Sequence, residues 1–453
     1  MGRAHPPSMD ALLCSPEGER LTAAYGRETV KEELRQAIAA GETRPDALTD
    51  RAGQALERRF APTLCRVLNG TGVLLHTNLG RAPLCSDARA ALEDVLPGYA
   101  SVEFDAQTGG RGRRQDHVRA AARDLFGAED AMAVNNNAAA VFLALAALAR
   151  GRTVLVSRGE LVAIGGSFQI PEILEASGAQ LLEVGTTNRT TLDDYRRALA
   201  RGPALVLTVH PSNYEIRGFT ERPAPRAIAG LAREAGIPWL HDQGTGCVEP
   251  LDEFGVPGEP TVNSCLADGA DLVTFSGDKL FGGPQAGFIA GRADLVGRLA
   301  AYPIARVVRP DKMTLAALAA TLHAWKRGRW RDFPIYRAAG ASLASLEVRA
   351  EAIRTALARG ALNGGASAVA AEVVPSLALF GGGTSPEKTF PSRALAVAVA
   401  GVAPEALAAR WRARPLPLVG RVAEGRALVD LRSILPAEDA DLIGALAGSA
   451  DIS

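Results

Sequence analysis

Seven short apolar runs alternate with helix-like segments through the middle of the chain, and this pattern constrains its fold most strongly. The runs cover residues 131–134, 153–156, 180–184, 204–209, 238–240, 271–275 and 287–290. Continuous apolar strands separated by helices are typical of a mostly parallel sheet that is covered on both faces. The sequence therefore predicts an α/β core around a seven-stranded sheet. Because ligands of such sheets bind outside the carboxyl ends of the strands, the residues after each run are the candidates for chemistry.

The segments on either side of this core have different patterns, and a chain of 453 residues is long enough for several domains. Val30 and Leu34 share one face of an amphipathic helix near the N-terminus, and a second amphipathic pattern follows. Near the C-terminus a triple glycine at 381–383 predicts a turn, since no Gly-Lys-Ser/Thr follows it. The predicted domains are a helical N-terminal domain at 1–63, a core domain at 64–335 and a small α+β domain at 336–453.

Composition narrows the class of protein. The formal net charge is zero, which gives no support to a nucleic-acid partner. The five cysteines are scattered with no Cys-x-x-Cys pair, a pattern that indicates reduced thiols in a cytoplasm and argues against disulfides and a zinc site. No apolar run is long enough to cross a membrane, and the first residues lack the apolar core of a signal peptide. We therefore expect a cytoplasmic protein without a membrane partner.

Residues 271–287 contain the most informative lysine of the chain. An apolar strand is followed by Ser276 and Lys279, and then by a glycine-rich corner and a second apolar strand. This order predicts an exposed lysine held rigidly at the edge of a sheet. Such an amine forms a Schiff base with pyridoxal phosphate when its surroundings lower its pKa, and the Ser276 hydroxyl is well placed for the cofactor phosphate. Taken alone, Lys279 also fits a surface lysine beside a hairpin.

Polar side chains follow other strands of the predicted sheet. Asn136, Asn137 and Ala138 open an alanine-rich helix, whose free N–H groups suit a phosphate, although one asparagine is explained by helix capping. Asp242 follows the run at 238–240 and can pair with a protonated pyridine nitrogen. Asn213 follows the run at 204–209 and could bind the phenolic oxygen of the cofactor. Residues 157–160 could flank the ring.

An asparagine-led helix, an aspartate and a Ser-x-x-Lys lysine, in that order, resemble the fold-type I (aspartate aminotransferase-like) pyridoxal phosphate enzymes. Longer segments resemble the bacterial selenocysteine synthases, the L-seryl-tRNA(Sec) selenium transferases. The matching segments are 66–83, 134–141, 156–161, 185–190, 275–287, 309–315 and 418–421. The similarity covers essentially the whole chain, including the N-terminal helices, and its motifs are more specific than the fold.

The resemblance implies a reaction and its residues. Lys279 would carry pyridoxal phosphate and remove the Cα proton of a seryl group on tRNA(Sec), the hydroxyl would leave, and selenium from selenophosphate would add. Asp278 matches a functional position of the family. The expected anion site for selenophosphate consists of Arg81, Arg306, Arg309 and the nearby Lys312, because guanidinium forks suit a tetrahedral oxyanion. For Arg306 and Arg309, solvated surface arginine is the alternative without the family match.

The resemblance also implies how the chain assembles. The N-terminal helices of the family recognise the tRNA, and dimers form a ring-shaped decamer with active sites between subunits. This chain departs from the family in two respects. Its N-terminal helices lack a basic excess, so attraction of tRNA must come from local patches or several subunits. Gln243 stands where the family more often has an apolar residue.

Two other functions compete with this interpretation. A related pyridoxal phosphate lyase would act on a free small amino acid or amino sugar acid, but such relatives typically lack the N-terminal helices. A catalytically silent tRNA-binding scaffold would not need Lys279 and Asp242, and both are intact. Binding of tRNA(Sec) separates the first rival from the transferase, and a visible absorbance band from the cofactor separates the second.

Overall fold

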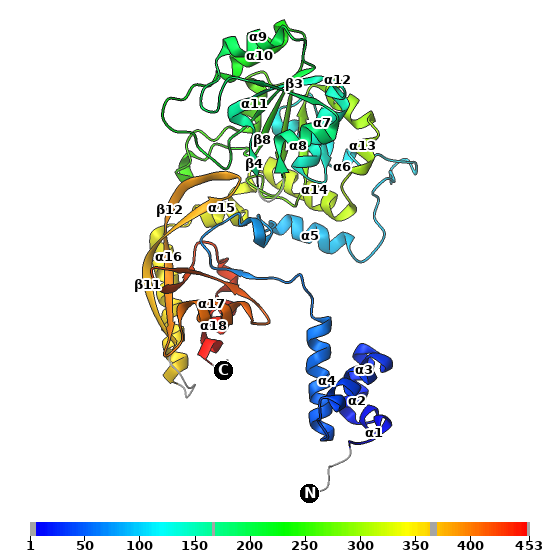
Figure 1. Cartoon of the computed structure of the whole chain (residues 1–453), viewed down its shortest axis with the longest axis vertical. Helices are drawn as coiled ribbons and strands as arrows, with labels where there is room; N and C mark the ends of the chain where they lie inside the picture. The colour runs from blue at the N-terminus through cyan, green and yellow to red at the C-terminus, as the bar shows by residue number, and fades with distance from the viewer. Residues whose placement is uncertain (1–5, 165–167, 363–368, 451–453) are drawn as a thin grey trace. The chain divides into compact units, whose positions relative to one another are not determined.

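The protein, seen in a computed structural model, consists of two compact units, Met1–Arg66 and Val67–Ser453 (Figure 1). The structure describes residues 6–164, 168–362 and 369–450. The first unit ends three residues beyond the boundary that the sequence predicts at 63. Within the described ranges no helix is both long enough and apolar enough to cross a bilayer.

The first unit is a small bundle of four helices, as the amphipathic patterns predict. Ser8 and Ser15 cap the first two helices by accepting hydrogen bonds from backbone N–H groups in their first turns. Leu21, Leu34 and Leu56 are fully buried and form the centre of the bundle. The helices are α1 (Met9–Leu13), α2 (Pro16–Tyr25), α3 (Arg27–Ala39) and α4 (Pro45–Phe60).

All seven predicted core strands form and pair in one sheet, which confirms the α/β prediction. The strands are β2 (Asp130–Val134), β3 (Thr153–Ser157), β6 (Gln180–Val184), β7 (Leu205–Val209), β8 (Trp239–Gly244), β9 (Leu272–Ser276) and β10 (Gly287–Gly291). Their order across the sheet is β2-β10-β9-β8-β7-β3-β6. The sheet is mostly parallel, because only β10 runs antiparallel to its two neighbours.

Helices cover both faces of this sheet, which explains why its strands are apolar throughout (Figure 1). In β10, Phe288 packs on one side and Ile289 on the other, and Leu272 and Val273 of β9 alternate in the same way. The first side carries α6 (Asp116–Phe126), α10 (Pro225–Glu234), α11 (Val262–Ala267) and α14 (Lys312–Lys326). The second side carries α7 (Asn137–Ala149), α8 (Ile170–Ser177) and α12 (Ala293–Ala301).

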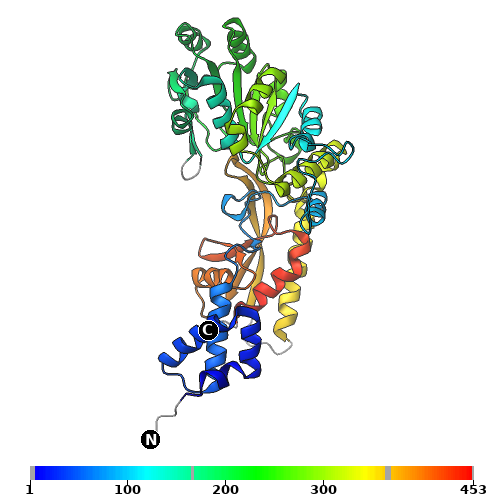
Figure 2. The same cartoon turned by 90° about the vertical axis from the view of Figure 1, so that its right-hand side faces the viewer.

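The C-terminal part of the second unit is an antiparallel sheet with helices on it, as predicted. Its strand order is β11-β12-β15-β14, and β11 and β12 form a long hairpin (Figure 2). The glycines at 382 and 383 form the turn of this hairpin, which confirms a turn rather than a phosphate loop. The elements are α16 (Leu343–Leu362), β11 (Val369–Gly381), β12 (Thr384–Val399), α17 (Pro404–Arg412), β14 (Arg421–Ala423), β15 (Arg426–Asp430) and α18 (Asp439–Ala447).

One buried arginine, Arg432, forms hydrogen bonds both with this sheet and with the end of a helix that precedes it in the chain. The predicted boundary at 335/336 falls inside α15 (Pro334–Ala339), whose last carbonyls have no partner within the helix. Arg432 is only 4% exposed and donates to the carbonyls of Ala338, Ala339 and Ala341, and also to that of Pro391. A single guanidinium group therefore joins the end of α15 to strand β12.

We predict that Arg432→Met lowers the free energy of unfolding by about 3 kcal/mol, because four buried or partly buried backbone carbonyls lose a charged donor. Urea unfolding of the whole chain measures this loss. The matched control is Arg426→Met on β15, where the side chain is 46% exposed and faces Glu372. The control should change stability by less than about 0.5 kcal/mol. Equal losses in the two variants would show that the carbonyl contacts contribute little.

Candidate active site

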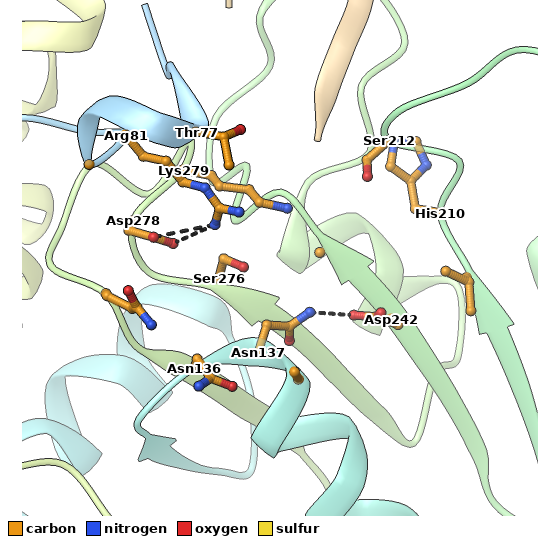
Figure 3. Close-up of a pocket in the computed structure, with 15 residues that line it drawn as sticks. Thr77, Arg81, Asn136, Asn137, His210, Ser212, Asp242, Ser276, Asp278 and Lys279 are labelled. Carbon is orange, nitrogen blue, oxygen red and sulfur yellow. Dashed lines mark hydrogen bonds and ion pairs between the residues drawn. The ribbon is translucent and has the colours of Figure 1, made fainter. Parts of the chain in front are cut away.

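A cavity of about 360 Å³ opens where β7, β8 and β9 end and α7 begins (Figure 3). This is the edge at which parallel sheets place their ligands. Predicted site residues from four separate segments line it together. They are Arg81, Asn136, Asn137, Ala138, Asp242, Ser276, Asp278 and Lys279.

Lys279 follows β9, but the structure corrects the prediction that it is exposed. Its side chain is buried, and the residue is only 4% exposed. Burial, with a smaller contribution from the charge of Arg81, lowers its pKa to about 8, although Asp242 and Asp278 act in the opposite direction. A large share of the amine is therefore unprotonated slightly above neutral pH, as a nucleophile or a base requires.

Asp242 lies inside β8 rather than after it, because the strand continues to Gly244. Its carboxylate is buried and accepts hydrogen bonds from Nδ2 of Asn137 at 2.8 Å and Oγ1 of Thr274 at 3.0 Å. Burial raises its pKa, and these two hydrogen bonds oppose the rise. A cationic group in the cavity would stabilise the ionised carboxylate further.

The two asparagines at the start of α7 have different roles. Asn136 caps the helix, since its side chain accepts from the N–H of Ala139 at 2.8 Å. Asn137 instead orients Asp242, and its own Oδ1 is buried with no hydrogen-bond partner among the described residues. The backbone N–H groups of Asn137 and Ala138 belong to the first turn and have no acceptor within the helix. Gly287 permits this turn, because a Cβ there would lie 2.2 Å from the carbonyl oxygen of Asn136.

An ion pair forms the opposite wall of the cavity from this helix start (Figure 3). Nη1 of Arg81 lies 3.3 Å from both carboxylate oxygens of Asp278. Arg81 has a φ of 60°, a left-handed conformation that costs a residue other than glycine about 1–2 kcal/mol. The backbone is strained where it delivers this guanidinium group to the cavity, and such strain is common at functional sites.

Four predicted site residues do not line this cavity. They are Asn213, Arg306, Arg309 and Lys312. Asn213 is not part of the cavity lining, and its Nδ2 donates to the carbonyl of Ala163 at 3.0 Å, so its contact with the phenolic oxygen stays a prediction. Arg306 and Arg309 line a separate hollow, where Nη1 of Arg309 lies 3.1 Å from Oε1 of Glu103. Nζ of Lys312 donates to the backbone carbonyls of residues 95 and 98. The expected anion site is therefore divided within one chain.

The segment at 157–160 also turns away from the cavity. Glu160 is buried, and its Oε2 accepts from the N–H of Val209 at 3.0 Å. Burial raises the pKa of Glu160 to about 7. The carboxyl group of Glu160 therefore supports the start of the loop after β7.

Sequence reasoning missed several residues of the cavity wall. His210 and Ser212 follow β7 directly, so the rule that selected Asn213 could have found them. Nε2 of His210 lies 3.4 Å from Oε1 of the buried Glu259. Thr77 and Gln285 also line the cavity, and although both lie in segments that resemble the family, neither follows the carboxyl end of a predicted strand directly.

The cavity has the donors and acceptors that pyridoxal phosphate needs. The free N–H groups of α7 and the Ser276 hydroxyl suit a phosphate, and the buried carboxylate of Asp242 suits a pyridinium nitrogen. The amine of Lys279 suits an aldehyde. The unpartnered Oδ1 of Asn137 provides a further polar contact for a bound group. The described residues therefore fit this cofactor.

Comparison with known proteins matches the chain to one family over most of its length. A family model described as L-seryl-tRNA selenium transferase matches residues 67–435, and one described as the selenocysteine synthase N terminal matches residues 7–40. The chain is 44% identical to L-seryl-tRNA(Sec) selenium transferase of Geobacter sulfurreducens, with 97% of each chain covered. It is 42% identical to the protein of that name from Rhizobium meliloti, with 98% of this chain and 97% of the relative covered.

A likeness among solved structures concerns the fold alone. D-glucosaminate-6-phosphate ammonia-lyase superposes with a TM-score of 0.60 at 18% identity, covering 87% of this chain and 98% of that one. The match in sequence is far higher to the transferases and extends through the N-terminal helices, which the model of the N-terminal segment also matches. The chain belongs to the L-seryl-tRNA selenium transferase family.

Proposed function

We propose that this chain converts L-seryl-tRNA(Sec) to L-selenocysteinyl-tRNA(Sec), with pyridoxal phosphate bound between Lys279 and Asp242. One observation carries the proposal beyond family membership. The single amine of the cavity is buried and has a pKa of about 8, and it shares the cavity with a buried carboxylate and a free helix N-terminus.

The cofactor, when bound, supplies a cationic ring that withdraws electrons from the Cα of the seryl group. Asp242 would keep the ring nitrogen protonated, and Asn137 and Thr274 fix the carboxylate in place through their hydrogen bonds. The start of α7 and the Ser276 hydroxyl would hold the phosphate. The buried position of these groups excludes water, which strengthens each polar contact.

Lys279 acts as the base in this proposal. Burial and the charge of Arg81 favour the neutral amine, so Nζ can accept the proton from Cα. The same proton can then pass to the departing hydroxyl group, which leaves as water. Asp278 holds the Arg81 guanidinium group beside the amine through both carboxylate oxygens. We therefore assign Asp278 the role of positioning Arg81.

We propose that the selenium donor is selenophosphate and that a second copy of the chain completes its site. Arg81 lies at the cavity, whereas Arg306 and Arg309 line a different hollow of the same chain. In a symmetric dimer, Arg306 and Arg309 of each chain would lie at the cavity of the partner and would complete its anion site. The homo-oligomer that we propose is built from such dimers, and the family resemblance predicts a decamer.

We propose that the four N-terminal helices bind the tRNA. Several basic side chains of this unit are paired within it, as Arg59 is with Glu32 and Glu33, and Arg27 with Asp10. Local patches must therefore supply the attraction for phosphate groups. The match of residues 7–40 to the N-terminal family model supports this role. The substrate and the five free cysteines support a cytoplasmic location.

The activity assay supplies purified chain with pyridoxal phosphate, seryl-tRNA(Sec) and selenophosphate, and it measures selenium bound to tRNA. We predict that Lys279→Ala lowers this rate by at least about 10³-fold, because it removes the base. The control is Lys326→Ala, an exposed lysine paired with Asp124, which should retain activity. Conversion that persists in Lys279→Ala would contradict the mechanism. Turnover of free serine or a sugar acid, without binding of tRNA(Sec), would favour the lyase.

We predict that the rate at which pyridoxal phosphate attaches to Lys279 rises with pH through about 8 and levels off above it, because only the neutral amine reacts. Visible absorbance and borohydride trapping measure this rate. Arg81→Gln should move the midpoint to higher pH, since removing a neighbouring positive charge favours the ammonium form. A midpoint that stays the same in Arg81→Gln would show that the arginine has no influence on the amine.

We predict that Lys279→Ala and Arg309→Ala chains, each inactive alone, regain activity when they are coexpressed. A random mixture should recover about one quarter of the wild-type rate, because one site in four then has an intact lysine and a partner's intact arginine. Coexpression of two differently tagged Lys279→Ala chains is the control and should give no recovery. Absence of recovery in the mixture would mean that Arg309 acts within its own chain.

A further inference from the structure

The turn of the long β11–β12 hairpin lies against the amine of Lys279. Gly381 pairs with Thr384, and the two residues between them form the turn. A Cβ added to Gly383 would lie 2.8 Å from Nζ of Lys279 and 3.1 Å from its Cε. Gly383 is buried and has a φ of 82°, so both its conformation and its surroundings favour glycine. The part of the C-terminal sheet that lies against the amine of Lys279 at this position is therefore the backbone of a glycine.

Hydrogen bonds hold this turn in place. The N–H groups of Leu74 and Leu75 donate to the carbonyls of residues 379 and 380, and the N–H of Leu379 donates back to Gly72. The segment that makes these contacts continues to Thr77 and Arg81, which line the cavity. The hairpin and the segment that leads to Arg81 therefore stabilise each other.

The first residue of the turn region packs more closely than the second. A Cβ at Gly381 would lie 2.7 Å from Cγ1 of Val73, and one at Gly382 would lie 3.7 Å from Oγ1 of Thr77. Thr384 is fully buried, and its hydroxyl has no hydrogen-bond partner among the described residues. The start of the turn therefore packs against the segment at 73–77, to which the hydrogen bonds of Leu74 and Leu75 also join it.

We propose that Gly383 is a positioning residue for Lys279 in the reaction proposed above, on which this inference rests. Its missing side chain lets the hairpin close onto the amine, so that the turn limits where Nζ can lie and shields it from water. A methyl group at this position would overlap with the amine. Because a lysine side chain is flexible whereas the turn is held by hydrogen bonds, the amine would move and the backbone would stay.

The test compares Gly383→Ala with Gly425→Ala. Gly425 is also the second residue of a two-residue hairpin turn in the same sheet, and its φ is 68°. No described atom lies within 4 Å of a Cβ added at Gly425. Both variants therefore carry the same cost of a left-handed alanine, and their melting temperatures should fall by similar amounts. Only the first variant places a methyl group against the reactive amine.

Two measurements decide the proposal. We expect kcat on seryl-tRNA(Sec) to fall on the order of 10²-fold in Gly383→Ala with KM unchanged, because a small displacement of a reacting group has an effect of that size. Borohydride trapping of pyridoxal phosphate on Lys279 should slow in the same variant, while Gly425→Ala should match the wild type in both measurements. Trapping needs no tRNA, so it stays informative if the proposed transferase activity fails.

Two results would overturn the proposal. Equal kcat and equal trapping rates in the two alanine variants would show that the turn does not position the amine. A much larger fall in melting temperature for Gly383→Ala than for Gly425→Ala would show that the backbone yields rather than the lysine. In that case the glycine serves folding and has no specific role toward Lys279.

Discussion

The burial of one amine at the carboxyl end of the sheet is the constraint on which the site depends. A buried ammonium group is costly, and the surrounding charges decide how much of that cost remains. Asp242 and Asp278 favour the charged form of Lys279, and Arg81 opposes it. Burial, the largest cause, and the charge of Arg81 together outweigh the carboxylates, so the pKa falls to about 8. The neutral amine is thus a property of its surroundings, since an exposed lysine would be protonated at that pH.

The loop that carries Lys279 is rigid because neighbouring elements bind its backbone. The N–H of Leu280 donates to the carbonyl of Thr245, and Nε1 of Trp325 donates to the carbonyl of Phe281 at 2.9 Å. The buried hydroxyl of Tyr336 donates to the carbonyl of Leu280. Side chains of α14 and α15 therefore hold the backbone of this loop, and the turn of the β11–β12 hairpin in the C-terminal domain packs against the side chain of Lys279. The position of the amine depends on the packing of both domains of the second unit.

Two of the arginines predicted to bind an anion, Arg81 and Arg309, are each held by a carboxylate. Arg81 lies at the cavity and is held by Asp278, whereas Arg309 is held by Glu103 in a separate hollow. Guanidinium groups paired with carboxylates are fixed in place before any anion arrives. The division of these groups between two hollows of one chain is the observation from which we propose that a second copy completes the site.

The sequence by itself determined the seven strands, the order of the chemical groups along them and the family, because apolar periodicity and strand-end motifs are local. It also identified Lys279, Asp242 and the start of α7 as one site, since parallel strands must end at the same edge. Only the tertiary structure decided that Lys279 is buried, which of the residues after β7 line the cavity, and that Gly383 lies against the amine. Burial and contacts between segments far apart in the chain arise from packing, and no local pattern encodes them.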